Sequence, residues 1–467
     1  MAQYTISSKT KVAPTRVQRI KNGIEAIARE KPAQLTLMIF FIIIIFVTFL
    51  LCLPISTANG DFPKFIDALF TATSAVCVTG LSTVDVANQW SGFGHAVIMV
   101  GIKIGGLGFM TLASFLVLAI SKSIGLTQKI IIADASQTEK LGEIKRLIKA
   151  VMLISAVCEL VIFSILLPHL YYSGKYSFAK SVWYSMFTSI STFNNAGFLI
   201  FPEGSDFFVK DALSVVIFGL GIFLGSIGFP VMLNVLSNIK SPKNWSLHSK
   251  LTLISHFVLL FLGMLSIGVL EWINPHTIAK MSFGSKLANI FLFSAGPRSG
   301  GISVIDSDQM HQSSLLIQDI LMFIGGGSAS TAGGIKLTTV ALMILAIVAE
   351  ARGDSQIQAF GRHIPTTVLR LGVAVTITSI AIVLSATMVI LAVTDLRLDS
   401  VLFECLSAFG NVGLSMGITS NLPLLAKCVL IILMFVGRVG PITLTVALAM
   451  RQQRQVIKYP AEKIAVG

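Results

Sequence analysis

The chain has 467 residues, of which 54% are hydrophobic and only 12% are charged. A soluble globular protein carries about 25% charged residues, so the composition excludes a water-soluble fold and indicates an integral membrane protein. The net charge of +13 would suit nucleic acid, but 23 of the 35 Lys and Arg residues fall in five segments on one predicted side of the membrane. This asymmetry follows the positive-inside rule, so it excludes a nucleic-acid partner and predicts cytoplasmic termini. Nine basic residues, Arg298 among them, are assigned to the opposite side.

Along the chain, four units of similar length follow one another. Each unit has a long apolar segment, a short apolar segment and a second long apolar segment. A helix needs about 20 apolar residues to cross a hydrocarbon core of ~30 Å, so the long segments are expected to span and the short ones to be re-entrant. The predicted parts are a cytoplasmic N-terminal segment at 1–32, units at 33–120, 147–238, 250–349 and 367–449, and a cytoplasmic tail at 450–467.

One residue pattern recurs once in each unit. A Phe is followed four residues later by Ser or Ala, and ten residues later by Gly. The copies are Phe70, Ser74 and Gly80; Phe187, Ser191 and Gly197; Phe291, Ala295 and Gly301; Phe403, Ser407 and Gly413. Irregular backbone at membrane depth is tolerated only where it lines a water-filled cavity or is buried in protein. The pattern therefore predicts an all-α polytopic fold with four helix–re-entrant loop–helix repeats around one central pore. Eight ordinary spans with coincidental glycines are the alternative, which the constant spacing disfavours.

The residues around each repeated glycine suit a cation. Ser177, Ser285 and Asp399 are expected to cap the short helices on the outer side. The helix C-termini, which are the negative ends of the helix dipoles, would then converge on the pore. Because no charged residue is present, selection would come from backbone carbonyls that replace the ion's water. The predicted filter residues are Val78, Thr79, Gly80, Asn195, Ala196, Gly197, Ser299, Gly300, Gly301, Asn411, Val412 and Gly413.

The second long segment of the third unit, 314–349, contains a glycine-rich stretch. As one helix the segment would be about 54 Å long, which exceeds the hydrocarbon core. Five glycines fall within ten residues, and each is ~1 kcal/mol less favourable than Ala in a helix. We therefore expect a broken helix with a flexible loop at 325–336 beneath the filter. Close helix packing is the alternative explanation, whereas a phosphate-binding loop is excluded because Leu337, not Ser or Thr, follows Lys336.

The ionisable residues inside apolar segments include Arg438, Lys336, Glu159 and Lys103. Arg438 is expected to have a functional role because a buried cation is costly in a membrane, and the alternative is snorkelling to the cytoplasmic surface. Lys336 is expected to snorkel or to cap carbonyls of the loop. Glu159 is able to pair with a buried cation, but the sequence identifies no partner for it and gives no role for Lys103.

Several motifs in this order resemble the membrane subunit of Ktr-type potassium transporters, in the Trk/Ktr/HKT superfamily. They are Thr-Gly-Leu at 79–81, Ile-Gly-Gly-Leu-Gly-Phe at 104–109, Phe-Asn-Asn-Ala-Gly-Phe at 193–198, Pro-Arg-Ser-Gly-Gly at 297–301, Ser-Ala-Phe at 407–409 with Val-Gly-Leu at 412–414, and Gly-Arg-Val-Gly-Pro at 437–441. The resemblance implies K+ at the filter carbonyls and an intramembrane gate. The gate residues would be Gly325, Gly326, Gly327, Ser328, Ala329, Ser330, Thr331, Ala332, Gly333, Gly334, Lys336 and Arg438.

The resemblance also implies partners and a location. These are a homodimer with one pore in each chain, a cytosolic regulatory ring of RCK type that binds ATP or ADP, and a bacterial plasma membrane. Sodium dependence is a further feature of the family. No Rossmann glycine pattern follows a predicted strand, so this chain is expected to bind no nucleotide itself. The basic cytoplasmic segments are expected to meet anionic membrane lipid.

The third filter loop departs from the family pattern. Relatives read Arg-Thr-Ala-Gly-Phe, whereas this chain has Arg298-Ser299-Gly300-Gly301-Ile302. Two smaller residues and a lost aromatic predict a looser loop and weaker discrimination between potassium and sodium.

Coupled secondary transport and membrane-bound catalysis fit the sequence less well than a pore does. A coupled secondary transporter often has inverted repeats, but here all four re-entrant segments lie on the low-charge side, which favours a channel-like pore. A membrane enzyme would need a nucleophile and a base in one place, and the histidines are scattered.

Overall fold

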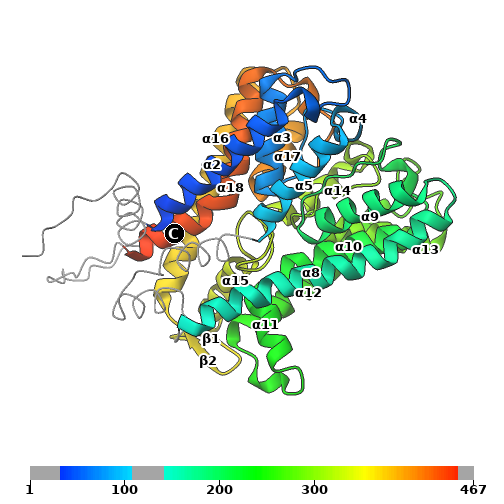
Figure 1. Ribbon diagram of the computed structural model, residues 1–467. Coiled ribbons are helices and arrows are strands. Elements are labelled where there is room, and N and C mark those ends of the chain that lie inside the picture. Colours follow the sequence, from blue (N-terminus) through cyan, green and yellow to red (C-terminus); the bar gives the residue numbers. More distant parts are fainter. Residues whose placement is uncertain (1–31, 108–140, 451–467) are drawn as a thin grey trace, which may run out of the picture.

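The computed structural model describes residues 32–107 and 141–450 (Figure 1). Most of the predicted N-terminal segment, residues 108–120 of the first unit and nearly all of the tail at 450–467 lie outside these ranges.

The described chain is built mainly of helices, which form four successive groups. The first has α2 (Pro32–Leu51), α3 (Phe65–Cys77), α4 (Val86–Gln89) and α5 (Gly92–Gly106), and the second has α8 (Leu141–Tyr172), α9 (Phe178–Phe193), α10 (Ala212–Ile227) and α11 (Phe229–Ser237). The third has α12 (Leu247–Glu271), α13 (Phe283–Ala295), α14 (Gln312–Phe323) and α15 (Leu337–Arg352), and the fourth has α16 (Thr366–Ala392), α17 (Leu398–Gly410) and α18 (Leu424–Met450). Single 3-10 turns lie at Pro54–Ser56, Asp206–Phe208, Pro242–Asn244, Ser307–Gln309 and Thr419–Asn421.

Several of these helices suit a membrane. Within the described ranges, α8 from Lys149 to Tyr172, α12 and α16 are long and apolar enough to cross one, and the bent pair α10–α11 would be a fourth span. The shorter helices α3 and α5 are also apolar.

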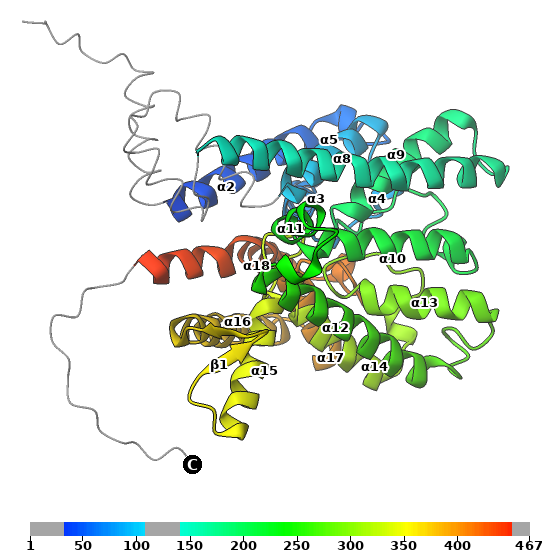
Figure 2. The same ribbon diagram turned by 90° about the horizontal axis from the view of Figure 1, so that it is seen from below.

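The four groups follow one another around a common centre (Figure 2). Helix α5 packs against α9, α10 against α13, and α14 against α17. The series closes because α18, the last helix, packs against α3 of the first group. The short helices α3, α9, α13 and α17 are thereby placed on the inside, and Phe70, Phe187 and Phe403 of the repeated pattern are fully buried.

A small hairpin departs from the all-α expectation. Strand β1 (Ile357–Ala359) pairs antiparallel with β2 (Arg362–Ile364), and the apolar pair Ile357 and Ile364 is buried. Phe360 and Gly361 between the strands have φ of 51° and 72°. Positive φ at both central residues is what a two-residue hairpin turn requires. The expectation of an all-α fold missed this hairpin, because its turn lies in a basic connecting segment and was not recognised.

The second long segment of the second unit, 210–238, is not one continuous helix. It bends by 89° between α10 and α11. Pro230 follows the break at Gly228, and a proline cannot donate the hydrogen bond that would continue α10. Gly228 has φ of 102°, and a Cβ added to it would lie 2.6 Å from the Ser328 carbonyl oxygen. The continuous apolar run hid this bend.

The caps of the short helices were only partly identified. Ser177 caps α9, since its hydroxyl accepts from the Lys180 amide at 3.5 Å. Helix α13 is capped by Ser282, not Ser285, because the Ser282 hydroxyl accepts from the Ser285 amide at 3.3 Å. Asp399 lies in the first turn of α17, one residue after the helix begins.

Candidate functional site

The four repeated glycines meet in a closed ring. A Cβ added to Gly80 would lie 3.1 Å from the Gly197 Cα, and one added to Gly197 would lie 3.0 Å from the Gly301 Cα. A Cβ on Gly301 would lie 3.1 Å from the Gly413 Cα, and one on Gly413 would lie 3.0 Å from the Gly80 Cα. All four glycines have positive φ, between 59° and 97°. Glycine alone adopts this conformation readily and leaves the centre free of side chains.

Carbonyl oxygens gather between the glycines. The Ala196 oxygen would be 2.6 Å from a Cβ on Gly80, the Val412 oxygen 2.2 Å from one on Gly301, and the Thr79 oxygen 2.2 Å from one on Gly413. These oxygens belong to the residues that directly precede glycines of the neighbouring groups. The ring is therefore lined by backbone acceptors and by no charged side chain.

The same backbone turn precedes each glycine. The residues two positions earlier have φ of 58° at Val78, 61° at Asn195, 72° at Ser299 and 48° at Asn411. Left-handed conformations cost a residue other than glycine roughly 1–2 kcal/mol. Four such residues in equivalent places indicate that the surrounding packing imposes one loop geometry.

The repeated serine explains part of this geometry. The Ser74 hydroxyl accepts from the Gly80 amide at 3.0 Å, and the Ser407 hydroxyl accepts from the Gly413 amide at 3.0 Å. The Ser74, Ser191 and Ser407 carbonyls accept from the amides of Thr79, Ala196 and Val412. The side-chain hydroxyl of Ser191, in contrast, has no partner among the described residues.

This difference gives a matched pair of substitutions. Ser407→Ala leaves the partly buried Gly413 amide without its acceptor, which is expected to destabilise the protein by about 1 kcal/mol and to weaken ion selectivity. Ser191→Ala removes a hydroxyl that bonds to nothing described, and it is expected to preserve both properties. Thermal melting in detergent and reversal potentials would measure the two variants. Equal behaviour of the pair would contradict the assigned role of the Ser407 hydroxyl.

The third loop is held differently from the other three. Position 295 is Ala, so no hydroxyl is available, and the chain makes an extra turn in which the Gly300 amide donates to the Gly296 carbonyl at 2.7 Å. The Ser299 hydroxyl donates to the Gly410 carbonyl at 2.8 Å and accepts from the Gly333 amide at 3.2 Å. A methyl group on Gly300 would lie 2.5 Å from an Ile222 side-chain carbon. Ile222 thus fills the space beside Gly300, and the loop is packed and hydrogen-bonded.

The glycine-rich stretch forms a loop between two helices. Helix α14 ends at Phe323 and α15 begins at Leu337. The loop closes on itself where the Gly325 amide donates to the Ile335 carbonyl at 2.9 Å. Two hydrogen bonds of 2.8 Å tie it to the end of α10. The Gly327 amide donates to the Ser226 carbonyl, and the Thr331 hydroxyl donates to the Gly225 carbonyl.

This loop contacts the filter loops directly. A Cβ on Gly333 would lie 2.1 Å from the Asn411 side-chain oxygen, so the Gly333 backbone packs directly against the Asn411 side chain. Asn411 in turn donates to the Thr79 hydroxyl at 2.9 Å and to the Met434 carbonyl at 2.8 Å. The stretch 325–336 and the glycine ring are therefore one connected assembly. Ser328 lies in the earlier part of the loop, where its hydroxyl is 3.1 Å from the Thr338 hydroxyl.

Two cationic side chains belong to this assembly, the buried Arg438 and the half-buried Lys336. The Arg438 guanidinium donates to the Thr331 carbonyl in the loop and to the Gly105 carbonyl of α5 at 2.5 Å. The Lys336 ammonium donates to the Ala332 carbonyl at 2.7 Å, so it caps a carbonyl of the loop. Among the described residues, neither side chain forms an ion pair. Both side chains therefore place a positive charge next to the loop, and no carboxylate in the described residues pairs with it.

Sequence reasoning missed the burial of Arg298 and the pairing of Lys103 with Glu159. Arg298 was assigned to the outer side, but it is 1% exposed and its guanidinium donates to the His256 carbonyl at 2.9 Å. A count of basic residues by segment does not reveal this burial, because Arg298 lies within the third filter loop. Lys103 and Glu159 form an ion pair of 2.5 Å. They are distant in sequence and share no motif, so no signal linked them.

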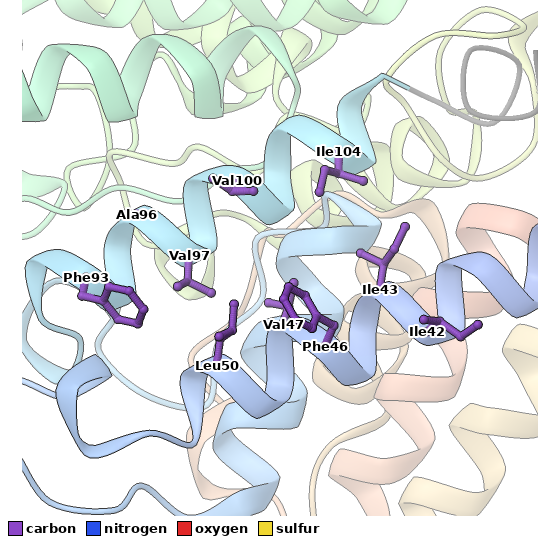
Figure 3. Close-up of a pocket in the computed structure, with 10 residues that line it drawn as sticks. All are labelled: Ile42, Ile43, Phe46, Val47, Leu50, Phe93, Ala96, Val97, Val100 and Ile104. Carbon is purple, nitrogen blue, oxygen red and sulfur yellow. The ribbon is translucent and has the colours of Figure 1, made fainter. Parts of the chain in front are cut away.

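A separate groove lies on the surface between α2 and α5 (Figure 3). Its volume is about 470 Å³. All ten lining residues are apolar: Ile42, Ile43, Phe46, Val47, Leu50, Phe93, Ala96, Val97, Val100 and Ile104. An apolar lining offers no ligand to an ion, so this groove is not the candidate site.

Known proteins resemble this chain over nearly its whole length. The family model for TrkH, described as a cation transport protein, matches residues 20–459. The Ktr system potassium uptake protein B of Bacillus subtilis is 37% identical over 439 residues, covering 94% of this chain and 97% of the relative. The potassium/sodium uptake protein NtpJ of Enterococcus hirae is 36% identical over 446 residues, covering 94% and 98%.

A solved structure agrees with the fold. The crystal structure of the potassium transporter TrkH from Vibrio parahaemolyticus matches with a TM-score of 0.66 at 17% identity, over 88% of this chain and 84% of that one. The extent of the family match and the identity to the Bacillus relative confirm the resemblance seen in the motifs. The chain belongs to the TrkH family of cation transport proteins, within the Trk/Ktr superfamily.

Proposed function

We propose that this chain takes up potassium through a gated pore that passes through the ring of Gly80, Gly197, Gly301 and Gly413. The closed ring is the observation that carries the proposal, because four equivalent loops from four helix groups meet at one point. The names of the Bacillus and Enterococcus relatives support potassium as the substrate. The pseudo-fourfold arrangement of helix, loop and helix belongs to this proposal.

Ion selection would arise from backbone carbonyls. The candidate filter has no charged side chain, so a cation would exchange its water for carbonyl oxygens such as those of Thr79, Ala196 and Val412. Short helices that end just before each loop add the negative ends of their dipoles. Neutral carbonyl ligands bind a monovalent cation weakly enough for it to leave the filter again. A divalent cation would be expected to need a ring of carboxylates.

The stretch 325–336 would be the gate. It lies against the filter through Ser299 and Asn411, and Arg438 and Lys336 add unneutralised positive charge. Ala329 in this loop has φ of 55°, a conformation that is unfavourable for alanine. A loop held by a few bonds and one strained residue is suited to a second conformation in which cations pass.

Regulation and assembly complete the proposal. The word "system" in the name of the Bacillus relative supports a further component, which we propose to be a cytosolic RCK-type ring that binds ATP or ADP. The name of the Enterococcus relative supports a dependence on sodium. We further propose a homodimer in a bacterial plasma membrane with both termini in the cytoplasm, as the distribution of basic residues indicates.

Purified protein in proteoliposomes would test the function. With unequal potassium concentrations on the two sides and sodium making up the difference, we expect a current that reverses near the potassium equilibrium potential. The sequence of the third loop differs from that of related proteins, which predicts weaker discrimination between potassium and sodium. The packing of this loop by Ile222 and the hydrogen bond of Ser299 instead favour a strong preference for potassium. A reversal potential that follows chloride, or no cation flux from folded protein, would contradict the proposed function.

A further inference from the structure

A polar cluster joins α5, α8 and the second filter loop, and all of its members except the partly exposed Lys103 are buried. The Lys103 ammonium donates to one oxygen of Glu159 at 2.5 Å and to the Ser155 hydroxyl at 2.8 Å. The same Glu159 oxygen accepts from Ser155 at 2.9 Å and from the side-chain amide of Asn194 at 2.7 Å. Ser155 and Asn194 are almost completely buried, and Glu159 is 9% exposed.

Such a cluster is expensive to place in an apolar span. Glu159 lies within the part of α8 that is long and apolar enough to cross a membrane. Ionisable groups at this depth are rare and usually functional. A buried ion pair is also weak evidence for stability, because desolvation offsets the attraction between the charges. The cluster therefore calls for a role other than holding α5 and α8 together.

Asn194 connects the cluster to the glycine ring. It is the C-cap of α9, and the next residue, Asn195, has the left-handed φ of 61° that starts the turn toward Gly197. The side-chain amide of Asn194 also donates to the Ile190 carbonyl at 2.8 Å, which closes the last turn of α9. The two donors of this one amide group thus point to Glu159 and to the end of the helix.

The same end of α5 reaches both filter and gate. A Cβ on Gly106 would lie 2.0 Å from the Asn194 side-chain oxygen, so α5 touches this residue without room for any side chain. One residue earlier, the Gly105 carbonyl accepts from Arg438 at 2.5 Å. Lys103 lies one turn back on this helix. A shift of α5 would therefore move contacts at Arg438 and at Asn194 together.

We propose that the Lys103–Glu159 pair positions the second filter loop by presenting a fixed acceptor to Asn194, and that it thereby helps to set the preference for potassium over sodium. Lys103 supplies the counter-charge that keeps this acceptor in place, and Glu159 acts through Asn194 without touching the ion. This inference rests on the proposed function, because it assigns a positioning role within the same filter.

Two double variants separate the acceptor from the charge. Lys103→Met with Glu159→Gln removes both charges but keeps an oxygen for Asn194. Lys103→Met with Glu159→Met removes both charges and the acceptor with little change of volume. Each avoids leaving one buried charge unpaired, which would itself destabilise the protein. Lys180→Met, at an exposed position in the first turn of α9, controls for loss of a cation.

The readout is the potassium/sodium permeability ratio in proteoliposomes, with thermal melting in detergent to confirm folding. We expect Lys103→Met with Glu159→Gln to keep the parental ratio, and Lys103→Met with Glu159→Met to lower it about tenfold, the size of one lost hydrogen bond. The control should match the parent. Equal ratios in both double variants, whether parental or reduced, would overturn the role of the acceptor.

Asn194→Ala keeps the test decisive if a double variant does not fold. It leaves Lys103, Ser155 and Glu159 bonded to one another and removes only the side chain that they hold. The same tenfold loss of preference is expected, and a parental ratio would overturn the proposal. Failure of the proposed function is distinguishable, because the parent itself would then show no potassium-selective flux.

Discussion

Gly80→Asp is expected to abolish potassium flux. Position 80 has φ of 97°, and an added Cβ would lie 2.6 Å from the Ala196 carbonyl oxygen, so the side chain must displace the ring. A carboxylate about 4 Å from a monovalent cation adds about 4 kcal/mol of attraction at an effective dielectric constant of about 20. That attraction would slow the release of the ion about a thousandfold. Flux of Rb+ into proteoliposomes would measure the loss.

A matched control is available in the same chain. Gly60 also has positive φ, at 75°, but a Cβ added to it meets nothing within 4 Å. Gly60→Asp therefore introduces the same residue at a similar backbone conformation, away from the ring. It is expected to transport like the parent. Parental flux in folded Gly80→Asp would show that the ions do not pass the glycines.

Arg438→Ala is expected to raise the resting flux of potassium. The substitution removes both hydrogen bonds that tie the loop at Thr331 to Gly105 of α5, and it removes a positive charge from the proposed path. Repulsion between two unit charges 4 Å apart is about 4 kcal/mol at an effective dielectric constant of about 20. An increase of about tenfold or more is therefore expected in the absence of any regulator, measured as Rb+ uptake.

Two further variants separate the causes of that increase. Arg438→Lys keeps the charge but cannot present two planar donors, so an intermediate flux is expected if hydrogen bonding contributes. Arg352→Ala, at the exposed C-terminal end of α15, removes an arginine far from the loop and should have no effect. A lower flux in folded Arg438→Ala than in the parent would contradict the role of this residue as a barrier.

Local patterns in the sequence carried much of the fold class and the family. Apolar segment length predicted a helical membrane protein, and the glycine motifs identified a superfamily that the comparisons confirm. These signals work because each is contained in a few consecutive residues. The Phe–Ser–Gly pattern named residues that the structure brings into one ring, although their role as an ion filter stays a prediction.

Features that depend on distant contacts were not predictable. The partner of Glu159 is Lys103, which lies 56 positions away on another helix, and no spacing rule connects them. A charge count assigns whole segments to one side of the membrane, so it did not reveal that the side chain of Arg298 in the third loop is buried. The bend at Gly228 was hidden because the apolar run continues through it. Pro230 lies just after the break, and the close approach of Ser328, 100 positions away, depends on the fold and was not predictable.

The position of a bound ion would test the central proposal most directly. Crystals of the protein grown with Rb+ in place of K+ would reveal the ion by its anomalous scattering. We predict a peak inside the ring of Gly80, Gly197, Gly301 and Gly413, within reach of the carbonyl oxygens of the residues that precede them. Rb+ bound elsewhere in the membrane region, with none at the ring, would show that the permeation path does not run through these glycines.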